Sequence, residues 1–220
     1  MSNDDRTRVI ELRQYQLRPG ARDTLIELFD SQFIESQEAC GMRVIGQFRD
    51  LDDPDRFVWL RGFASMEERA AGLTAFYGGP VWTEHGPAAN ATMVSSDDVH
   101  MLRPLAEPPT FQASDRTQRL LLAAILPCAP DGEIVGEIAA ACSGAEGDVL
   151  ALLGKEDAPN NWPRLSVHDR LVWVLIARFA SEWALDRGVA AVAAAAALHA
   201  DILDGPPELR RLAPTARSRL

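Results

Sequence analysis

The strongest constraint on this chain is a block of sequence that occurs twice. Residues 56–65 read Arg-Phe-Val-Trp-Leu-Arg-Gly-Phe-Ala-Ser, and residues 170–181 read Arg-Leu-Val-Trp-Val-Leu-Ile-Ala-Arg-Phe-Ala-Ser. Each copy follows a loop rich in Asp, Asn and Pro and precedes a segment with helical periodicity. A repeated supersecondary unit predicts two sister halves rather than one long α/β domain.

Strand and helix signals follow the same order in both halves. In the first half they predict strands at 9–17, 42–49, 57–64 and 92–102, and helices at 23–39, 65–77 and 81–91. In the second half they predict strands at 119–126, 148–155, 171–179 and 209–220, and helices at 131–142 and 181–200. Asp23 can cap the first helix and Gly41 can end it, while Ser65 begins a capping box. The order β-α-β-β-α-β is that of a ferredoxin-like domain.

We therefore predict an α+β protein in which tandem ferredoxin-like repeats pack sheet to sheet as an α/β barrel. The predicted units are a domain at 1–104, a proline-containing linker at 105–116 and a divergent domain at 117–220. Strands of the second half are apolar on both faces, which favours burial between the halves. The alternative is two loosely joined halves, each covered by another subunit. Even if the two halves pair within one chain, we expect edge strands of each sheet to stay available, which makes a homodimer possible.

Composition narrows the class of partner. Asp and Glu number 32 against 22 Lys and Arg, for a net charge of −10, and no basic stripe is present. We therefore expect neither nucleic acid nor an anionic membrane as partner. The N-terminal residues lack the apolar core of a signal peptide, and the 3 cysteines form no CxxC pair, so we expect a cytoplasmic protein with reduced thiols. No motif for nucleotide, zinc or serine-hydrolase chemistry occurs, and we predict no metal and no cofactor.

Alternation along the strands sorts side chains onto two faces. In the first strand Ile10 and Leu12 share one face, while Glu11, Arg13 and Tyr15 share the other. We expect the apolar face to lie under the helices and the polar, aromatic face to line a pocket between the two sheets. The alternative is a buried ion-pair network with a structural role. The candidate ligand-binding residues are Glu11, Arg13, Tyr15, Trp59, Arg61, Tyr77 and Trp82.

Histidine supplies one candidate catalytic group. His85 follows a Gly-Gly-Pro break and lies where a helix can start at the rim of the sheet, so it is the candidate general base. Its neighbour Glu84 does not share its helix face, and the alternative is a structural histidine. His100, His168 and His199 receive no catalytic role.

Several segments resemble bacterial NIPSNAP-family proteins. They are Val9-Ile-Glu-Leu-Arg-Gln-Tyr-Gln-Leu-Arg-Pro-Gly20, Arg56-Phe-Val-Trp59, Phe76-Tyr-Gly-Gly-Pro-Val-Trp82 with His85, and Ala88-Ala-Asn-Ala-Thr-Met93. The resemblance covers residues 8–104, and the tail at 207–218 also looks like the end of such proteins. It implies a dimeric α/β-barrel fold and little about activity. The wider barrel superfamily includes cofactor-independent monooxygenases, haem-degrading enzymes and decarboxylases, whose catalytic residues do not map onto this chain.

Three functions remain open at this point. The first is the binding of a small, largely apolar ligand between the two sheets. The second is a cofactor-independent enzyme of the oxygenase, isomerase or cyclase type acting on an apolar or aromatic substrate. The third is a non-catalytic assembly module.

Overall fold

The predicted order of elements recurs in both halves of the chain. The computed structural model describes residues 7–105, 111 and 120–220. The elements of the first half are β1 (Val9–Leu17), α1 (Arg22–Leu28), η2 (Phe29–Phe33), α2 (Ile34–Ala39), β2 (Arg43–Asp50), β3 (Arg56–Phe63), α3 (Met66–Tyr77), α4 (Pro80–Thr92) and β4 (Met93–Pro104). Those of the second half are β5 (Leu120–Leu126), α5 (Gly132–Gly144), β6 (Asp148–Lys155), β7 (Trp173–Phe179), α6 (Glu182–Ala197) and β8 (Glu208–Pro214). The predicted fold class is confirmed.

All the strands close into one antiparallel barrel. The order around it is β1-β3-β2-β8-β5-β7-β6-β4, so each half contributes four neighbouring strands. The halves join at two seams, β2–β8 and β4–β6, and each seam holds only 3 paired positions. The two seams are equivalent, because each joins the second strand of one half to the last strand of the other. The expectation of free edge strands is therefore wrong, and the predicted homodimer would need another surface.

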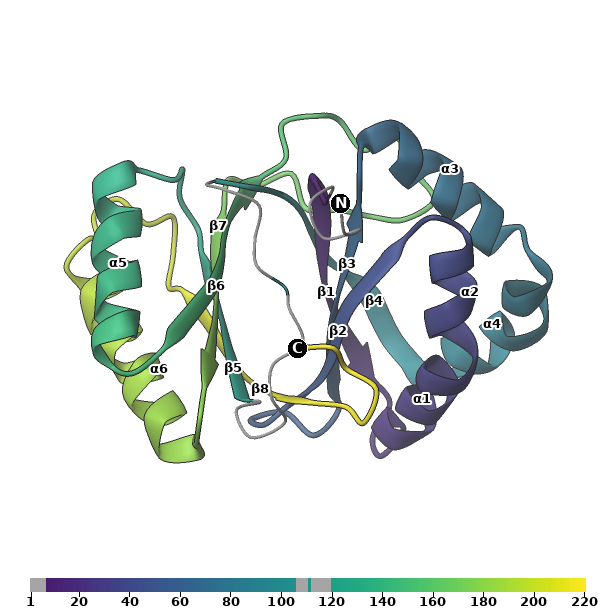
Figure 1. The fold of residues 1–220 in the computed structure, drawn as a ribbon, viewed down its shortest axis with the longest axis horizontal. Helices are drawn as coiled ribbons and strands as arrows, with labels where there is room; N and C mark the ends of the chain where they lie inside the picture. Colours follow the sequence, from purple (N-terminus) through teal and green to yellow (C-terminus); the bar gives the residue numbers. More distant parts are fainter. Residues whose placement is uncertain (1–6, 106–110, 112–119) are drawn as a thin grey trace.

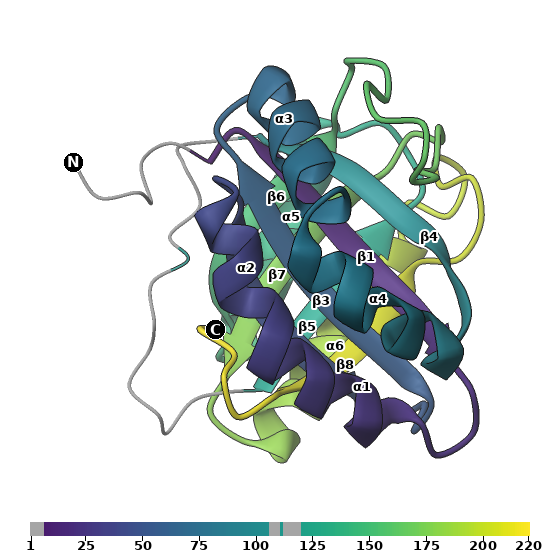
Figure 2. The same ribbon diagram turned by 90° about the vertical axis from the view of Figure 1, so that its right-hand side faces the viewer.

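Helices cover the outside of the barrel on two opposite sides. α1, η2, α2, α3 and α4 lie across the sheet of the first half, and α5 and α6 lie across that of the second (Figures 1 and 2). Among the described residues, no helix is both long and apolar enough to cross a bilayer.

The barrel interior is apolar and filled by side chains. Ile10, Leu12, Val58 and Leu60 of the first half meet the inward-facing residues of β5, β6 and β7 there. The predicted linker at 105–116 lies mostly outside the described residues, but Phe111 is buried in this same cluster. The alternating sets were assigned to the wrong faces: the polar, aromatic set lies under the helices and the apolar set lies inside the barrel. Closing a small barrel requires an interior of packed apolar side chains, which decides the assignment.

Local signals set most of the boundaries. Ser65 and Ser181 occupy equivalent N-caps, and their hydroxyls accept from the backbone N–H of Glu68 and Ala184, each at 3.2 Å. Asp23 is not a cap, because α1 begins after Ala21 and Asp23 instead pairs with a surface arginine of β2. Gly41, at φ 82°, ends the helical segment as predicted.

The C-terminal strand is shorter than predicted. β8 ends at Pro214, and the tail beyond it follows β2. The Thr215 N–H donates to the carbonyl of Gln47 at 2.9 Å, and the Gln47 N–H donates to the Ser218 hydroxyl at 3.1 Å. The tail therefore satisfies backbone groups of β2 that β8 does not reach.

Two glycines test how tightly the second half is packed. A methyl group at Gly188 of α6 would lie 2.3 Å from the buried ring of Phe179, whereas one at Gly136 of α5 would meet nothing within 4 Å. We expect Gly188→Ala to lower the free energy of unfolding by about 1–3 kcal/mol through overpacking. Gly136→Ala should raise it by about 0.5–1 kcal/mol through helix propensity. Urea denaturation measures both, and equal effects would contradict the close packing of α6.

Candidate functional site

A single buried carboxylate holds three arginines under the helices of the first half. Glu11 of β1 contacts Arg13 Nη1 at 2.8 Å, Arg61 Nε of β3 at 2.8 Å and Arg69 Nε of α3 at 2.7 Å. All four side chains are at most 1% exposed. Burial acts to raise the pKa of Glu11, but the attraction of the three guanidinium groups outweighs it and lowers that pKa well below its usual range. Glu11 is therefore ionised in the folded protein.

The network carries more positive than negative charge. In the described part of the chain the other hydrogen-bond partners of these arginines are neutral. Arg13 Nε donates to the Tyr15 hydroxyl at 3.0 Å, and Arg61 Nη1 donates to Gln37 Oε1 at 3.2 Å. Burial raises the pKa of Tyr15 against the influence of Arg13, so its phenol stays protonated. Three guanidinium groups against one carboxylate leave a surplus of two positive charges in a buried site.

An aromatic box lies directly against this network. Its cavity of about 20 Å³ is lined by Tyr15, Leu25, Phe29, Phe33, Gln37, Trp59, Phe76, Tyr77, Trp82, Ala89 and Met93. The Trp59 ring lies between two arginines, with the guanidinium carbons of Arg13 and Arg61 at 5.7 and 5.1 Å from its centroid. Tyr15, Trp59 and Gln37 thus each contact both the cavity and the arginine network.

A π-helical segment shapes one wall of the box. The predicted single helix at 23–39 is interrupted by η2, whose Phe29 and Phe33 are both buried and both line the cavity. Gln37 Nε2 donates to the carbonyl of Phe33 at 3.0 Å, which holds the amide oxygen toward Arg61. π-Helical turns inside α-helices occur frequently at functional sites.

The second half contributes a loop to the site of the first half. The segment between β6 and β7, light green in Figure 1, passes over the barrel toward α3. Asn160 and Asn161 accept from Arg69 Nη1 at 3.1 and 2.9 Å. Trp162 stacks on Tyr77 with ring centroids 5.1 Å apart and donates from Nε1 to a threonine of α3. The site is complete only when both halves are present.

The structure brings together most of the residues that the sequence singled out. Glu11, Arg13, Tyr15, Trp59 and Arg61 form one connected group, and Tyr77 and Trp82 lie half-buried at its rim. The predicted location between the two sheets is wrong, because these side chains project outward under the helices.

His85 lies apart from this group. It is on α4, it is not among the residues that line the cavity, and its Nε2 is 3.8 Å from a carboxylate oxygen of Glu84. Its role as general base stays a prediction. Sequence reasoning missed Arg69, Gln37 and Trp162, which lie on a helix face or in a loop where no alternation marks them.

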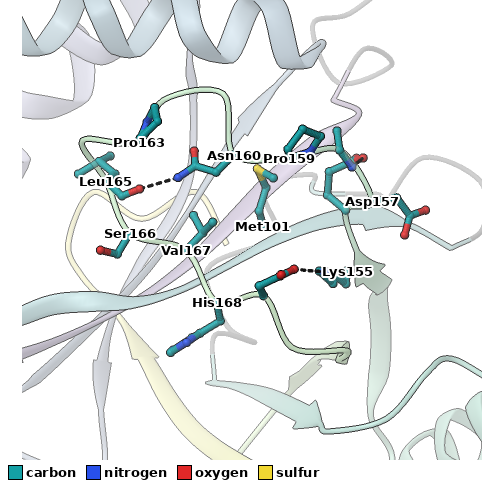
Figure 3. Close-up of a pocket in the computed structure, with 13 residues that line it drawn as sticks. Met101, Lys155, Asp157, Pro159, Asn160, Pro163, Leu165, Ser166, Val167 and His168 are labelled. Carbon is teal, nitrogen blue, oxygen red and sulfur yellow. Dashed lines mark hydrogen bonds and ion pairs between the residues drawn. The ribbon is translucent and has the colours of Figure 1, made fainter.

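A larger, open cavity lies beside the same loop. It has a volume of about 580 Å³ and is lined by Met101 and by residues of the segment 155–169 (Figure 3). Its charges are largely satisfied locally, since Lys155 pairs with Asp169 and Glu156 accepts from the Ala158 N–H. This cavity offers fewer unsatisfied groups than the buried arginine network.

Three metal-ligating side chains meet beside this cavity, and one of them, His168, also lines it. One ligand atom each from Asp98, His100 and His168 lies within 4.8 Å of the others. The spacing of these residues along the chain did not suggest a metal site, because His168 comes from the loop of the second half.

Together these features define a class of protein: an α/β barrel formed by two ferredoxin-like halves in one chain, with a polar, aromatic site under the helices of the first half. The NIPSNAP family model matches residues 10–108. This match lies within the first half of the chain and confirms the resemblance to the NIPSNAP family.

Two solved structures of other proteins share the fold over nearly the whole chain, and a third covers about half of it. A putative monooxygenase from Fusobacterium nucleatum is 9% identical with a TM-score of 0.63, covering 97% of this chain and 96% of that chain. An anthrone oxidase-like protein is 12% identical with a TM-score of 0.61, covering 98% and 95%. A NIPSNAP family protein of unknown function from Agrobacterium tumefaciens is 20% identical with a TM-score of 0.43, covering 47% and 95%. No curated protein matches the chain.

Removal of the Glu11 carboxylate should destabilise the fold, because the three buried arginines then lose their counter-charge. We expect Glu11→Gln to lower the free energy of unfolding at pH 7 by about 3–5 kcal/mol, because it leaves three buried guanidinium groups without a counter-charge. A matched control is Glu146→Gln, which removes an exposed partner of Arg187 and should change stability by about 1 kcal/mol or less.

The same pair of proteins gives a pH dependence with a defined sign. A carboxylate whose pKa is lowered on folding contributes stability that is complete above its ordinary pKa of 4.5 and is lost as the pH falls below it. The difference in free energy of unfolding between wild type and Glu11→Gln should therefore decrease by about 1.4 kcal/mol per pH unit below pH 4.5. Urea titrations between pH 7 and pH 3 measure this gap. A gap that stays constant would show that Glu11 does not titrate as this network requires.

Proposed function

We propose that the first half binds a small, largely aromatic ligand that carries a negative charge, in the box between its sheet and its helices. The observation that carries this proposal is the surplus of two guanidinium groups beside a cavity lined by aromatic rings. It replaces the expected pocket between the two sheets with a pocket on the other face of the same strands.

The charge of the network selects the charge of the ligand. Buried charges are costly unless they are paired, and Glu11 neutralises only one of the three arginines. A carboxylate, phenolate or enolate at the Tyr15 and Gln37 side of the box would supply the missing negative charge. Guanidinium groups bind such anions well because their N–H groups form a planar fork.

The aromatic side chains that line the box favour a ligand with an aromatic ring. Phe29, Phe33, Phe76 and Trp82 present ring faces and edges, and ring–ring contacts add to the burial of apolar area. A cavity of about 20 Å³ has room for roughly one water molecule. A ligand with an aromatic ring therefore requires the half-buried side chains at the rim, Tyr77 and Trp82, to move aside.

A matched pair of probes tests the charge requirement. We expect 2-naphthoate to bind at least about tenfold more tightly than the uncharged 2-naphthalenemethanol, a difference of about 1.4 kcal/mol. Arg13→Met should abolish this preference while the fold persists, because Glu11 keeps Arg61 and Arg69 as partners. Isothermal titration calorimetry measures both affinities.

The control for this experiment is Arg187→Met, which removes an exposed arginine on α6 and should leave the preference unchanged. Equal affinities for the two probes in the wild type, or an unchanged preference in Arg13→Met, would contradict the proposal.

Catalysis at the same site is the second candidate function. The structures of similar fold named as a putative monooxygenase and an anthrone oxidase-like protein supply a reaction class to test. In this chain the observation that favours it is again the arginine surplus, since fixed positive charge stabilises an enolate or phenolate formed from a bound substrate. The proton lost when such an anion forms passes to solvent, and Tyr15, which lines the cavity and is hydrogen-bonded to Arg13, is the candidate group that returns a proton to it.

Oxygen uptake tests the catalytic candidate. We expect the protein to accelerate oxygen consumption by a hydroxylated anthrone, and Tyr15→Phe to reduce the rate by about 10²–10⁴-fold if the phenol transfers a proton. The measurement uses an oxygen electrode, with His85→Ala as the comparison variant. A rate equal to that of buffer would remove this candidate and leave ligand binding as the proposal. An assembly role stays a prediction.

A further inference from the structure

One mouth of the barrel is polar, in contrast to its filled interior. In the pairing of β1 with β4, Gln14 lies opposite Asp98 and Leu12 lies opposite His100. Paired residues on antiparallel strands project to the same face, so Asp98 and His100 share the inward face of Leu12. His168 approaches them from the loop of the second half, where its backbone N–H donates to the carbonyl of Val99 at 2.8 Å.

The three side chains converge on one carboxylate oxygen. Asp98 Oδ1 lies 3.1 Å from His168 Nε2 and 3.7 Å from His100 Nε2, and the two imidazole rings have centroids 5.1 Å apart. Ligand atoms held about 2.1 Å from one ion lie roughly 3.0–3.4 Å apart in octahedral or tetrahedral coordination. The observed separations therefore need only small side-chain movements to fit a common ion.

His100 supplies an independent sign of a missing partner. Its side chain is 1% exposed, and its Nε2 has no hydrogen-bond partner among the described residues. Buried polar atoms of this kind are rare and call for an explanation.

Among the described residues, Asp98 has no arginine or lysine partner. The nearby arginines Arg170 and Arg210 instead form ion pairs with Glu208, with their Nη2 atoms 2.8 and 2.9 Å from its carboxylate oxygens. Gln14 Nε2 donates to Asp98 Oδ2 at 3.0 Å, which fixes the carboxylate with its other oxygen toward the histidines. Such an outer hydrogen bond is typical of metal sites.

We propose that Asp98, His100 and His168 bind one divalent first-row transition-metal ion, of the Zn²⁺ or Fe²⁺ class, at the junction of the two halves. Two imidazoles and one carboxylate are a known ligand set for such ions, and they leave coordination positions for water or a small anion. His168 lies on the surface, and in Figure 3 its ring points away from Asn160 and Pro163 of the same loop. The ion can therefore enter from solvent.

A simple hydrogen bond explains less of this geometry. It accounts for the contact between His168 and Asp98, as it does for the 2.7 Å contact of His199, in the turn after α6, with Glu137 of α5. It leaves the buried nitrogen of His100 without a partner. The His199–Glu137 pair thus serves as a control with one histidine, one carboxylate and no third ligand.

Zinc binding to the full chain tests the proposal. After treatment with a chelator, we expect one equivalent of Zn²⁺ to bind with a dissociation constant in the micromolar range or below. His168→Ala and Asp98→Asn should each weaken binding by at least about tenfold. His199→Ala should bind as the wild type does. His168 is exposed on a loop, so its variant should fold, and circular dichroism verifies this.

Cobalt gives a second readout that does not depend on affinity alone. Co²⁺ bound by two imidazoles and a carboxylate should show visible absorption bands that His168→Ala lacks and His199→Ala retains. Absence of saturable Zn²⁺ binding, or equal binding by wild type and His168→Ala, would overturn the proposal. The binding of 2-naphthoate concerns a different site, so its outcome does not affect this one.

Discussion

The contact of Glu11 with Arg13, Arg61 and Arg69 is the interaction on which the first half depends. It joins neighbouring strands β1 and β3 to helix α3, and through Arg69 it reaches the loop of the second half. Apolar packing alone would hold these elements at lower cost, because burying charge is expensive even when it is paired. The negatively charged ligand proposed above would offset the cost of the two excess positive charges in this network.

The loop between β6 and β7 gives the second half a part in both candidate sites. Asn160, Asn161 and Trp162 complete the arginine and aromatic site, and His168 completes the cluster at the barrel mouth. The two sites lie at different positions along one segment. If the loop has two discrete arrangements, ligand binding at one site would shift the loop between them and so change the affinity of the other site.

Much of the architecture could be predicted, because short local sequence signals determine where its helices and strands begin and end. The equivalent serine caps, the glycine at 41 and the repeated Trp block all indicate the order of elements correctly. The facing of the strands could not be predicted, because alternation yields two sets of side chains without saying which set the helices cover. Likewise Arg69, Trp162 and His168 join their sites only through tertiary contacts between segments far apart in the chain.

The two tryptophans of the repeated block, Trp59 and Trp173, have different surroundings in the two halves. Trp59 and Trp173 both project toward the helices of their own half, so the shared block adopts the same orientation twice. Trp59 lies between two arginines beside a cavity, whereas Trp173 lies in the apolar cluster of the second half, which includes Phe179. In the second half the ring of Phe179 presses against Gly188 of α6, which leaves no room at the equivalent place. One half therefore holds the candidate binding site, and the other closes the barrel and supplies the loop that contacts this candidate site.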